Sequence, residues 1–142
     1  MANIDRADWH YGGQYPKDLP AENGGTHIGI YLAWVINSDL GSEELLEYVA
    51  AKLPAFQRRE ITGRDLLLKE LDEKFFSSLL SEEGQAFTTA YYESNQYVQD
   101  YAEALGTGLE SLYHVKDSWD NYDRIAQTID QRLATWRDSR AV

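Results

Sequence analysis

Residues 26–37 read THIGIYLAWVIN, and this stretch decides the fold that we expect. Its apolar side chains lie on all sides of a helix, so a helix formed here has no polar face and should be buried on most sides. Thr26 can cap the start of such a helix, because a Thr side chain accepts a hydrogen bond from the backbone of the first turn. The sequence therefore predicts a central helix over residues 27–37.

Four more helices are predicted, each from a start signal followed by apolar residues at helical spacing. Ser and Thr are favourable N-cap residues, and Thr62 with Asp65 resembles a capping box. The predicted helices begin at Ser42, Thr62, Ser81 and near Asp117 or Ser118, and the first three end at Pro54, near Phe76 and at Gly106.

The rest of the chain adds an N-terminal arm to these helices. Residues 1–25 combine large aromatic rings with several Gly and Pro residues, which break helices. No stretch alternates apolar and polar residues for long, so little or no β-sheet is expected. A length of 142 residues is typical of one domain. The prediction is a single all-α domain over residues 1–142: a compact bundle of about five helices (residues 26–142) with an irregular arm (residues 1–25) packed on it.

Charge limits the classes of partner. The chain has 24 acidic and 13 basic residues, a formal charge of -11, which repels phosphates, so we do not expect nucleic acid as a partner. A basic protein is favoured instead. The longest apolar run, over residues 28–36, is far shorter than the roughly 20 residues that span a membrane. The first residues lack the pattern of a signal peptide, so we expect a cytoplasmic protein without membrane contact.

An interval without Lys or Arg separates Lys74 from Lys116, although six acidic residues lie within it. On the predicted fourth helix, acidic residues share the side opposite the apolar stripe, with tyrosines at its edges. Tyrosine offers a rigid contact surface, and carboxylates select a basic partner. The alternative is a solvated face whose tyrosine rings complete the core. The residues predicted for the interface are Tyr92, Glu93, Gln96, Asp100 and Glu103.

The histidines suggest a second site. The chain has three, and no two have the i, i+4 spacing that places metal ligands on one helical face, so we expect no metal ion and no cofactor. The chain has no cysteine and no Gly-x-Ser-x-Gly motif. A pocket between the arm and the first helix, lined by Trp9, His10, His27 and Tyr31, would nevertheless suit an enzyme or a ligand-binding domain. Joint chemistry there requires the rings of His10 and His27 to lie within about 10 Å in a shared cleft.

Four segments resemble the signature segments of an uncharacterised family of small acidic bacterial proteins, classed only as a domain of unknown function. They are DWHYGG (residues 8–13), YPKDLP (15–20), THIGIYLAW (26–34) and SLYHV (111–115). The resemblance implies a bacterial origin, and it carries over no catalytic residues. In size and charge, such proteins are similar to the immunity proteins that neutralise secreted toxins.

We therefore expect a non-enzymatic binding protein, an immunity protein that neutralises a basic toxin through the acidic, tyrosine-bearing face of the fourth helix and the nearby arm. The alternative is a small enzyme or ligand-binding domain with a pocket around Trp9, His10 and His27. A homo-oligomer is a third alternative, and the sequence does not predict the oligomeric state.

Overall fold

The computed structural model describes residues 2–140 and is mainly helical over that range. This part of the chain forms eight α-helices, three short 3-10 helices (η) and one antiparallel sheet of two strands. In chain order, the elements are β1 (Asn3–Arg6), α1 (Ala7–Tyr11), η1 (Ala21–Gly25), α2 (Thr26–Asn37), α3 (Glu43–Val49), α4 (Leu53–Gln57), α5 (Gly63–Glu70), β2 (Lys74–Phe76), η2 (Ser77–Leu79), α6 (Glu82–Tyr91), α7 (Gln96–Leu105), η3 (Leu112–His114) and α8 (Trp119–Arg140). The predicted helical character is confirmed, whereas the sheet was not predicted.

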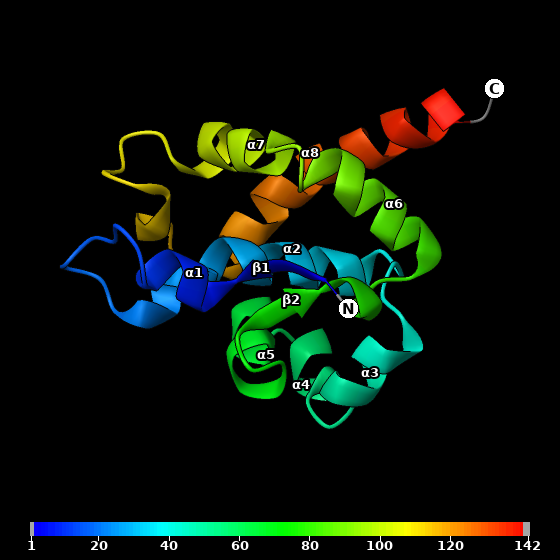
Figure 1. Cartoon of the computed structure of the whole chain (residues 1–142), viewed down its shortest axis with the longest axis horizontal. Coiled ribbons are helices and arrows are strands. Elements are labelled where there is room, and N and C mark those ends of the chain that lie inside the picture. The colour runs from blue at the N-terminus through cyan, green and yellow to red at the C-terminus, as the bar shows by residue number, and fades with distance from the viewer. Residues whose placement is uncertain (1, 141–142) are drawn as a thin grey trace.

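The predicted central helix is present as α2, which runs through the middle of the molecule (Figure 1). Every residue from Thr26 to Val35 is buried, as the lack of a polar face requires. Helices α3, α4 and α5 lie on one side of α2, and α6, α7 and α8 lie on the other (Figure 1). The main hydrophobic core therefore surrounds this helix.

Helices α2 and α5 approach each other closely because each has a glycine where they meet. A Cβ atom on Gly63 would overlap the carbonyl oxygen of Gly29, and one on Gly29 would overlap the backbone of Arg64. A larger residue at either position would push the helices apart. Beside this contact, Arg64 donates a hydrogen bond to the Thr26 hydroxyl over 3.1 Å. Thr26 is the first residue of α2, and the N-cap position is occupied by Gly25 without a capping side chain, so the cap predicted from the sequence is wrong.

The N-terminal arm is more regular than predicted. Residues 3–6 form β1, which pairs with β2 and places Asp5 opposite Phe75. Helix α1 follows directly, and η1 leads into α2. Between β1 and α2, only the connection over residues 12–20 lacks a helix or strand. The prediction of an irregular arm is wrong because strand pairing depends on a partner about seventy residues away, which a local pattern does not reveal.

Two predicted helix ends are displaced. The third helix ends at Glu70, before Phe76, because Asp72 and Glu73 take the left-handed backbone conformation with φ of 54° and 64° and turn the chain into β2. The second predicted helix ends at Val49, before Pro54. Pro54 lies instead in the first turn of α4, where its missing N–H removes no helical hydrogen bond. The predicted caps Ser42 and Ser81 and the capping box at Thr62 are confirmed.

The predicted fourth helix is two helices, α6 and α7. Asn95 interrupts it with a left-handed backbone (φ 72°), a conformation that Asn adopts more readily than most residues. Ser94 donates a hydrogen bond to the carbonyl oxygen of Ala90 over 2.7 Å at the end of α6. Because α7 leaves this turn in a new direction, residues before and after it do not share one helical face (Figure 1).

Helix α8 supplies positive charge to the interval without basic residues. Arg132 pairs with Asp100 over 2.9 Å, and Arg137 pairs with Glu83 over 2.7 Å. The predicted negative surface is therefore partly neutralised from within the chain. No helix within residues 2–140 is both long and apolar enough to cross a membrane: α8 has 22 residues but is polar, and the apolar α2 has only 12.

Candidate functional site

The candidate site is centred on a buried carboxylate, Asp5, whose side chain is 11% exposed. Its Oδ1 atom accepts hydrogen bonds from Nε2 of His10 at 2.7 Å and from the backbone N–H of Arg6 at 2.8 Å. Its Oδ2 atom accepts from the Tyr92 hydroxyl at 2.6 Å and lies 3.3 Å from Nε2 of His27. Each carboxylate oxygen therefore has two polar partners; of these four, two are close in the sequence and two, His27 and Tyr92, are distant.

Four elements bring these groups together. Strand β1 carries Asp5, and α1 follows it without a break, so His10 returns to the carboxylate after one helical turn. His27 lies in the first turn of α2, and Tyr92 directly follows α6. The rings of His10 and His27 lie 4.4 Å apart and nearly perpendicular. Joint chemistry of the two imidazoles requires less than about 10 Å between the rings, and this condition is met.

Electrostatics fix the charge of two groups in the cluster. Burial alone would raise the pKa of Asp5, but hydrogen bonds from His10, His27 and Tyr92 hold it well below its ordinary value. Burial lowers the pKa of His27, although the nearby Asp5 carboxylate opposes this shift. At neutral pH, Asp5 is therefore ionised and His27 is neutral.

A tyrosine extends the cluster on the other side of His10. The Tyr113 hydroxyl lies 2.7 Å from Nδ1 of His10. The ionised Asp5 carboxylate only accepts hydrogen bonds. Nε2 of His10 therefore carries a hydrogen atom and donates a hydrogen bond to Asp5. In the neutral ring, Nδ1 then accepts from the Tyr113 hydroxyl. Tyr113, His10 and Asp5 thus form a continuous chain of hydrogen bonds, with the order hydroxyl, imidazole and carboxylate.

This chain of hydrogen bonds borders a cavity of about 100 Å³. A cavity needs roughly 10–15 Å³ on this measure to hold one water molecule, so this one has room for several water molecules or for a small organic molecule. The walls are mainly apolar despite the imidazoles and hydroxyls among them. The lining residues are His10, His27, Val98, Tyr101, Leu112 and Tyr113. The site therefore combines space for a small ligand with a hydroxyl–imidazole pair at its wall.

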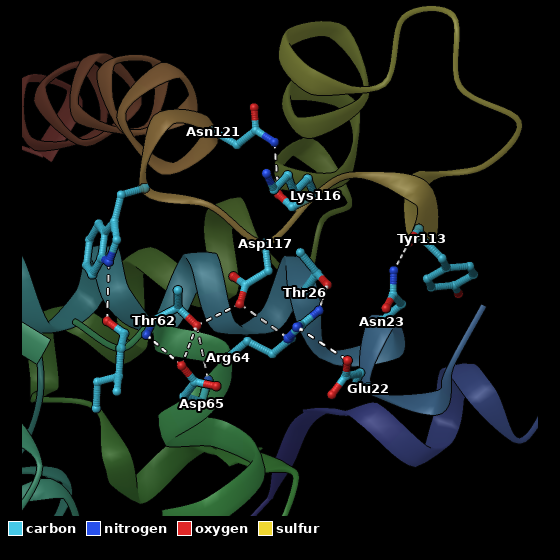
Figure 2. A network of polar contacts seen from close by, with 12 residues as sticks. Glu22, Asn23, Thr26, Thr62, Arg64, Asp65, Tyr113, Lys116, Asp117 and Asn121 are labelled. Carbon is cyan, nitrogen blue, oxygen red and sulfur yellow. Dashed lines mark hydrogen bonds and ion pairs between the residues drawn. The ribbon is translucent and has the colours of Figure 1, made fainter. Parts of the chain in front are cut away.

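A second polar network holds the cavity walls in place (Figure 2). Arg64 of α5 donates to Thr26, the neighbour of His27, and its Nε atom lies 3.2 Å from Asp117. The Asn23 side chain donates to the backbone carbonyl of Tyr113 over 2.9 Å. These contacts tie η1, α2 and α5 to the segment from η3 to α8. The positions of His27 and Tyr113 are therefore fixed by bonds outside the cavity.

The ligand atoms of Asp5, His10 and His27 lie within 4.8 Å of one another, as three metal ligands would. Tetrahedral ligands of zinc, with bonds near 2.0–2.1 Å, lie about 3.3 Å apart. The distance from Asp5 to His27 matches this value, whereas the 2.7 Å from Asp5 to His10 is that of a hydrogen bond. In this arrangement, the three side chains form a hydrogen-bonded set. The exposed acids Asp18 and Glu110 form a similar group with His114.

The residues predicted for an acidic interface do not form one surface. Tyr92 is buried against Asp5, and Asp100 is only 4% exposed. Asp100 accepts hydrogen bonds from Tyr91, Gln96 and Arg132. Glu93 and Glu103 are exposed, on opposite sides of the break at Asn95. The prediction of a continuous face is wrong for Tyr92 and Asp100, because α8 and β1 cover the positions that one long helix would have left in solvent.

The structure brings together two of the four residues predicted for the pocket. His10 and His27 line one cavity, but Trp9 and Tyr31 do not border it. Trp9 is 53% exposed on α1, and Tyr31 is fully buried, with its hydroxyl 2.9 Å from that of Thr88. The residues that the sequence analysis missed are Asp5, Tyr92 in its buried role, Val98, Tyr101, Leu112 and Tyr113. The pairing of Asp5 with His10 across five residues was the one local signal, and it is weak among 24 acidic residues.

Comparison with known proteins places the chain in a family but gives it no activity. Neither the curated proteins nor the solved structures contain a significant match to the sequence. A family model described as "Domain of unknown function (DUF7832)" matches residues 3–115, a range that includes every residue of the cluster and the cavity wall. The match covers most of the sequence, and the chain therefore belongs to this family of unknown function.

Proposed function

We propose that this protein binds a small molecule in the cavity beside His10 and His27 and exchanges a proton with it through Tyr113. The observation that carries the proposal is the unbroken chain of hydrogen bonds from Tyr113 through His10 to Asp5 at the cavity wall. A hydroxyl, an imidazole and a carboxylate in this order form the arrangement in which a base activates a hydroxyl group.

The proton path follows from the geometry. When the Tyr113 oxygen attacks or accepts a proton, its own proton moves to Nδ1 of His10, which becomes an imidazolium. The ionised Asp5 stabilises this cation over 2.7 Å. Burial raises the pKa of Tyr113, with a further contribution from Asp5, so the phenol stays protonated until a base removes its proton. Tyr113 then acts as the group in contact with the ligand, and His10 acts as its base.

A small electrophile tests this arrangement directly. Methanesulfonyl fluoride reacts with a tyrosine when the phenol oxygen forms a bond to sulfur, fluoride leaves and the proton passes to a neighbouring base. We expect Tyr113 to be labelled faster than Tyr48, an exposed tyrosine of α3 that serves as the internal control. Peptide mass spectrometry measures both rates in one sample.

Removal of the base should abolish this selectivity. His10→Gln is expected to slow the labelling of Tyr113 about 100-fold, the lower range of general-base effects, and to leave Tyr48 unchanged. Circular dichroism and the urea midpoint identify variants that remain folded. The proposal fails if Tyr113 reacts no faster than Tyr48, or if folded His10→Gln keeps the wild-type rate at Tyr113.

Neutralisation of a basic toxin stays a prediction from charge and size. The bacterial origin stays a prediction from the family resemblance, and the cytoplasmic location stays one from the pattern of the first residues. The structural basis of toxin neutralisation is narrower than the sequence suggested, because Asp100 is paired with Arg132, and Glu93 and Glu103 carry the exposed charge. Charge reversal of these two residues should slow association with a basic partner and reduce the salt dependence of its rate. Unchanged association would exclude this surface.

A further inference from the structure

We propose that the ligand of the cavity is a small organic cation, an alkylated ammonium group held against aromatic rings. This inference rests on the proposed function, because it assumes that the cavity is a ligand site, and it adds the chemical class of the ligand. Three features support it: the rings that form the wall, the sign of the surrounding charge, and the lack of a Lys or Arg side chain among the lining residues of the described range 2–140.

Aromatic and imidazole rings form most of the wall. The ring of His27 lies 6.2 Å from that of Tyr101 and 6.2 Å from that of Tyr113, with angles of 69° and 61° between the planes. The ring centroids of His10 and Tyr113 lie 5.6 Å apart, with an angle of 61° between the ring planes. Rings at such angles contact one another edge to face, and all four of these rings line the cavity. Cations bind in such cages because the faces of the rings carry negative partial charge.

The charge around the cavity favours a cation. Asp5 is ionised directly behind His10 and His27, and His27 is neutral because burial lowers its pKa. The exposed carboxylates Asp18 and Glu110 lie near His114, next to Tyr113 in the chain. The whole protein has a formal charge of -11, which attracts cations and repels anions.

The lining also disfavours an anion. An anionic ligand requires a Lys or Arg side chain or a set of backbone N–H groups, and no Lys or Arg lines the cavity within the described residues 2–140. The guanidinium of Arg64, which helps to hold the cavity wall, is already engaged by Thr26 and Asp117. Val98 and Leu112 give the remaining wall an apolar surface, which suits the methyl groups of an alkylated ammonium ion.

The experiment compares two molecules of the same shape. Choline and its neutral carbon analogue, 3,3-dimethylbutanol, differ only in the charged atom, and calorimetry or NMR measures their binding to the full chain. We expect choline to bind at least about tenfold more tightly than the neutral alcohol, and acetate not to compete. Equal binding of choline and the alcohol, or no saturable choline binding, would overturn the inference.

Variants locate the binding site. Tyr101→Leu should weaken choline binding about 5- to 30-fold by removing one ring. Leu112→Trp should block the cavity and abolish binding. This variant tests the inference if Tyr101→Leu does not fold. Tyr48→Leu on the distant helix α3 should have no effect. Unchanged affinity in a folded Tyr101→Leu or Leu112→Trp variant would show that choline binds elsewhere and would also overturn the inference.

Tyr113→Phe separates this inference from the proposed function. The substitution removes the hydroxyl that the sulfonyl fluoride labels, so labelling at residue 113 is lost, whereas the ring remains and choline binding should stay saturable. If choline does not bind while Tyr113 of the wild type is labelled through His10, the cavity is a ligand site for another class of molecule. If choline binds while Tyr113 is not activated, the cage is correct and the proton path is wrong.

Discussion

Replacement of Tyr92 by Phe should destabilise the protein by about 2 kcal/mol at neutral pH. The ring would keep its stacked contact with Tyr97, at 5.0 Å and 19°, so the variant loses only the hydroxyl that donates to Asp5 over 2.6 Å. A hydrogen bond to a charged group contributes about 1.5–3 kcal/mol. The value should lie near the lower half of that range, because His10, His27 and the Arg6 backbone still donate to the carboxylate. For a chain of this length, the melting temperature should fall by about 4–8 °C.

The same variant should change the pH dependence of stability. The folded-state pKa of Asp5 lies below its ordinary value of 3.8, so this carboxylate stabilises the fold above that pH and ceases to do so as the pH falls and it is protonated. Without the Tyr92 hydroxyl, the folded pKa of Asp5 should rise. The difference between wild type and Tyr92→Phe should therefore be complete at pH 7 and shrink below about pH 4.

Tyr97→Phe is the matched control for this experiment. Tyr97 is equally buried, but its hydroxyl donates to a neutral acceptor, the backbone carbonyl of His27, over 2.6 Å. Its loss should cost about 1 kcal/mol with no dependence on pH between 3 and 7. Urea unfolding at several pH values measures both variants. If Tyr92→Phe and Tyr97→Phe give the same cost and the same pH profile, Asp5 is not held as a buried anion by Tyr92.

Three further predictions concern the fold around the site. Gly63→Ala should cost at least about 2 kcal/mol in urea unfolding, because the new methyl group overlaps the backbone of α2, and a wild-type midpoint would contradict this contact. Arg132→Gln should cost about 1–2 kcal/mol, since it leaves a buried carboxylate without its cation, whereas Arg137→Gln, between exposed partners, should cost less than about 1 kcal/mol; equal costs would refute the distinction. His27 should lower stability as the pH falls below 6.5, because burial lowers its folded pKa and only the unfolded chain takes up the proton. A folded His27→Gln variant should lose this dependence, at most about 1.4 kcal/mol per pH unit, when urea midpoints at pH 7 and 5.5 are compared.

The sequence predicted those features of the fold that depend on neighbouring residues. The buried helix over residues 27–37 and the caps at Ser42, Thr62 and Ser81 follow from local spacing and local hydrogen bonds, and the structure contains them. The break at Asn95 was missed because the apolar spacing continues across it. Spacing alone cannot show that one residue adopts a left-handed backbone.

The candidate site was only partly predictable for a related reason. The sequence singled out His10 and His27 by their rarity, but their contact depends on how α1 packs against α2. Asp5 did not stand out among 24 acidic residues, and only burial distinguishes it. The prediction of a continuous acidic face was wrong in part because Arg132, 32 residues further along the chain, pairs with Asp100. No local sequence pattern indicates that pairing.

The chain of hydrogen bonds at Asp5 also constrains the order of folding. The bond from Tyr92 to Asp5 closes a loop of 87 residues, and the bond between His10 and Tyr113 closes one of 103. Contacts so distant in sequence form late, because the entropy of loop closure must be overcome first. During synthesis, the first strand emerges long before Tyr113, and Asp5 stays hydrated until most of the chain has left the ribosome. The cavity then exists only in molecules that have completed folding, so binding of its ligand reports on native protein alone.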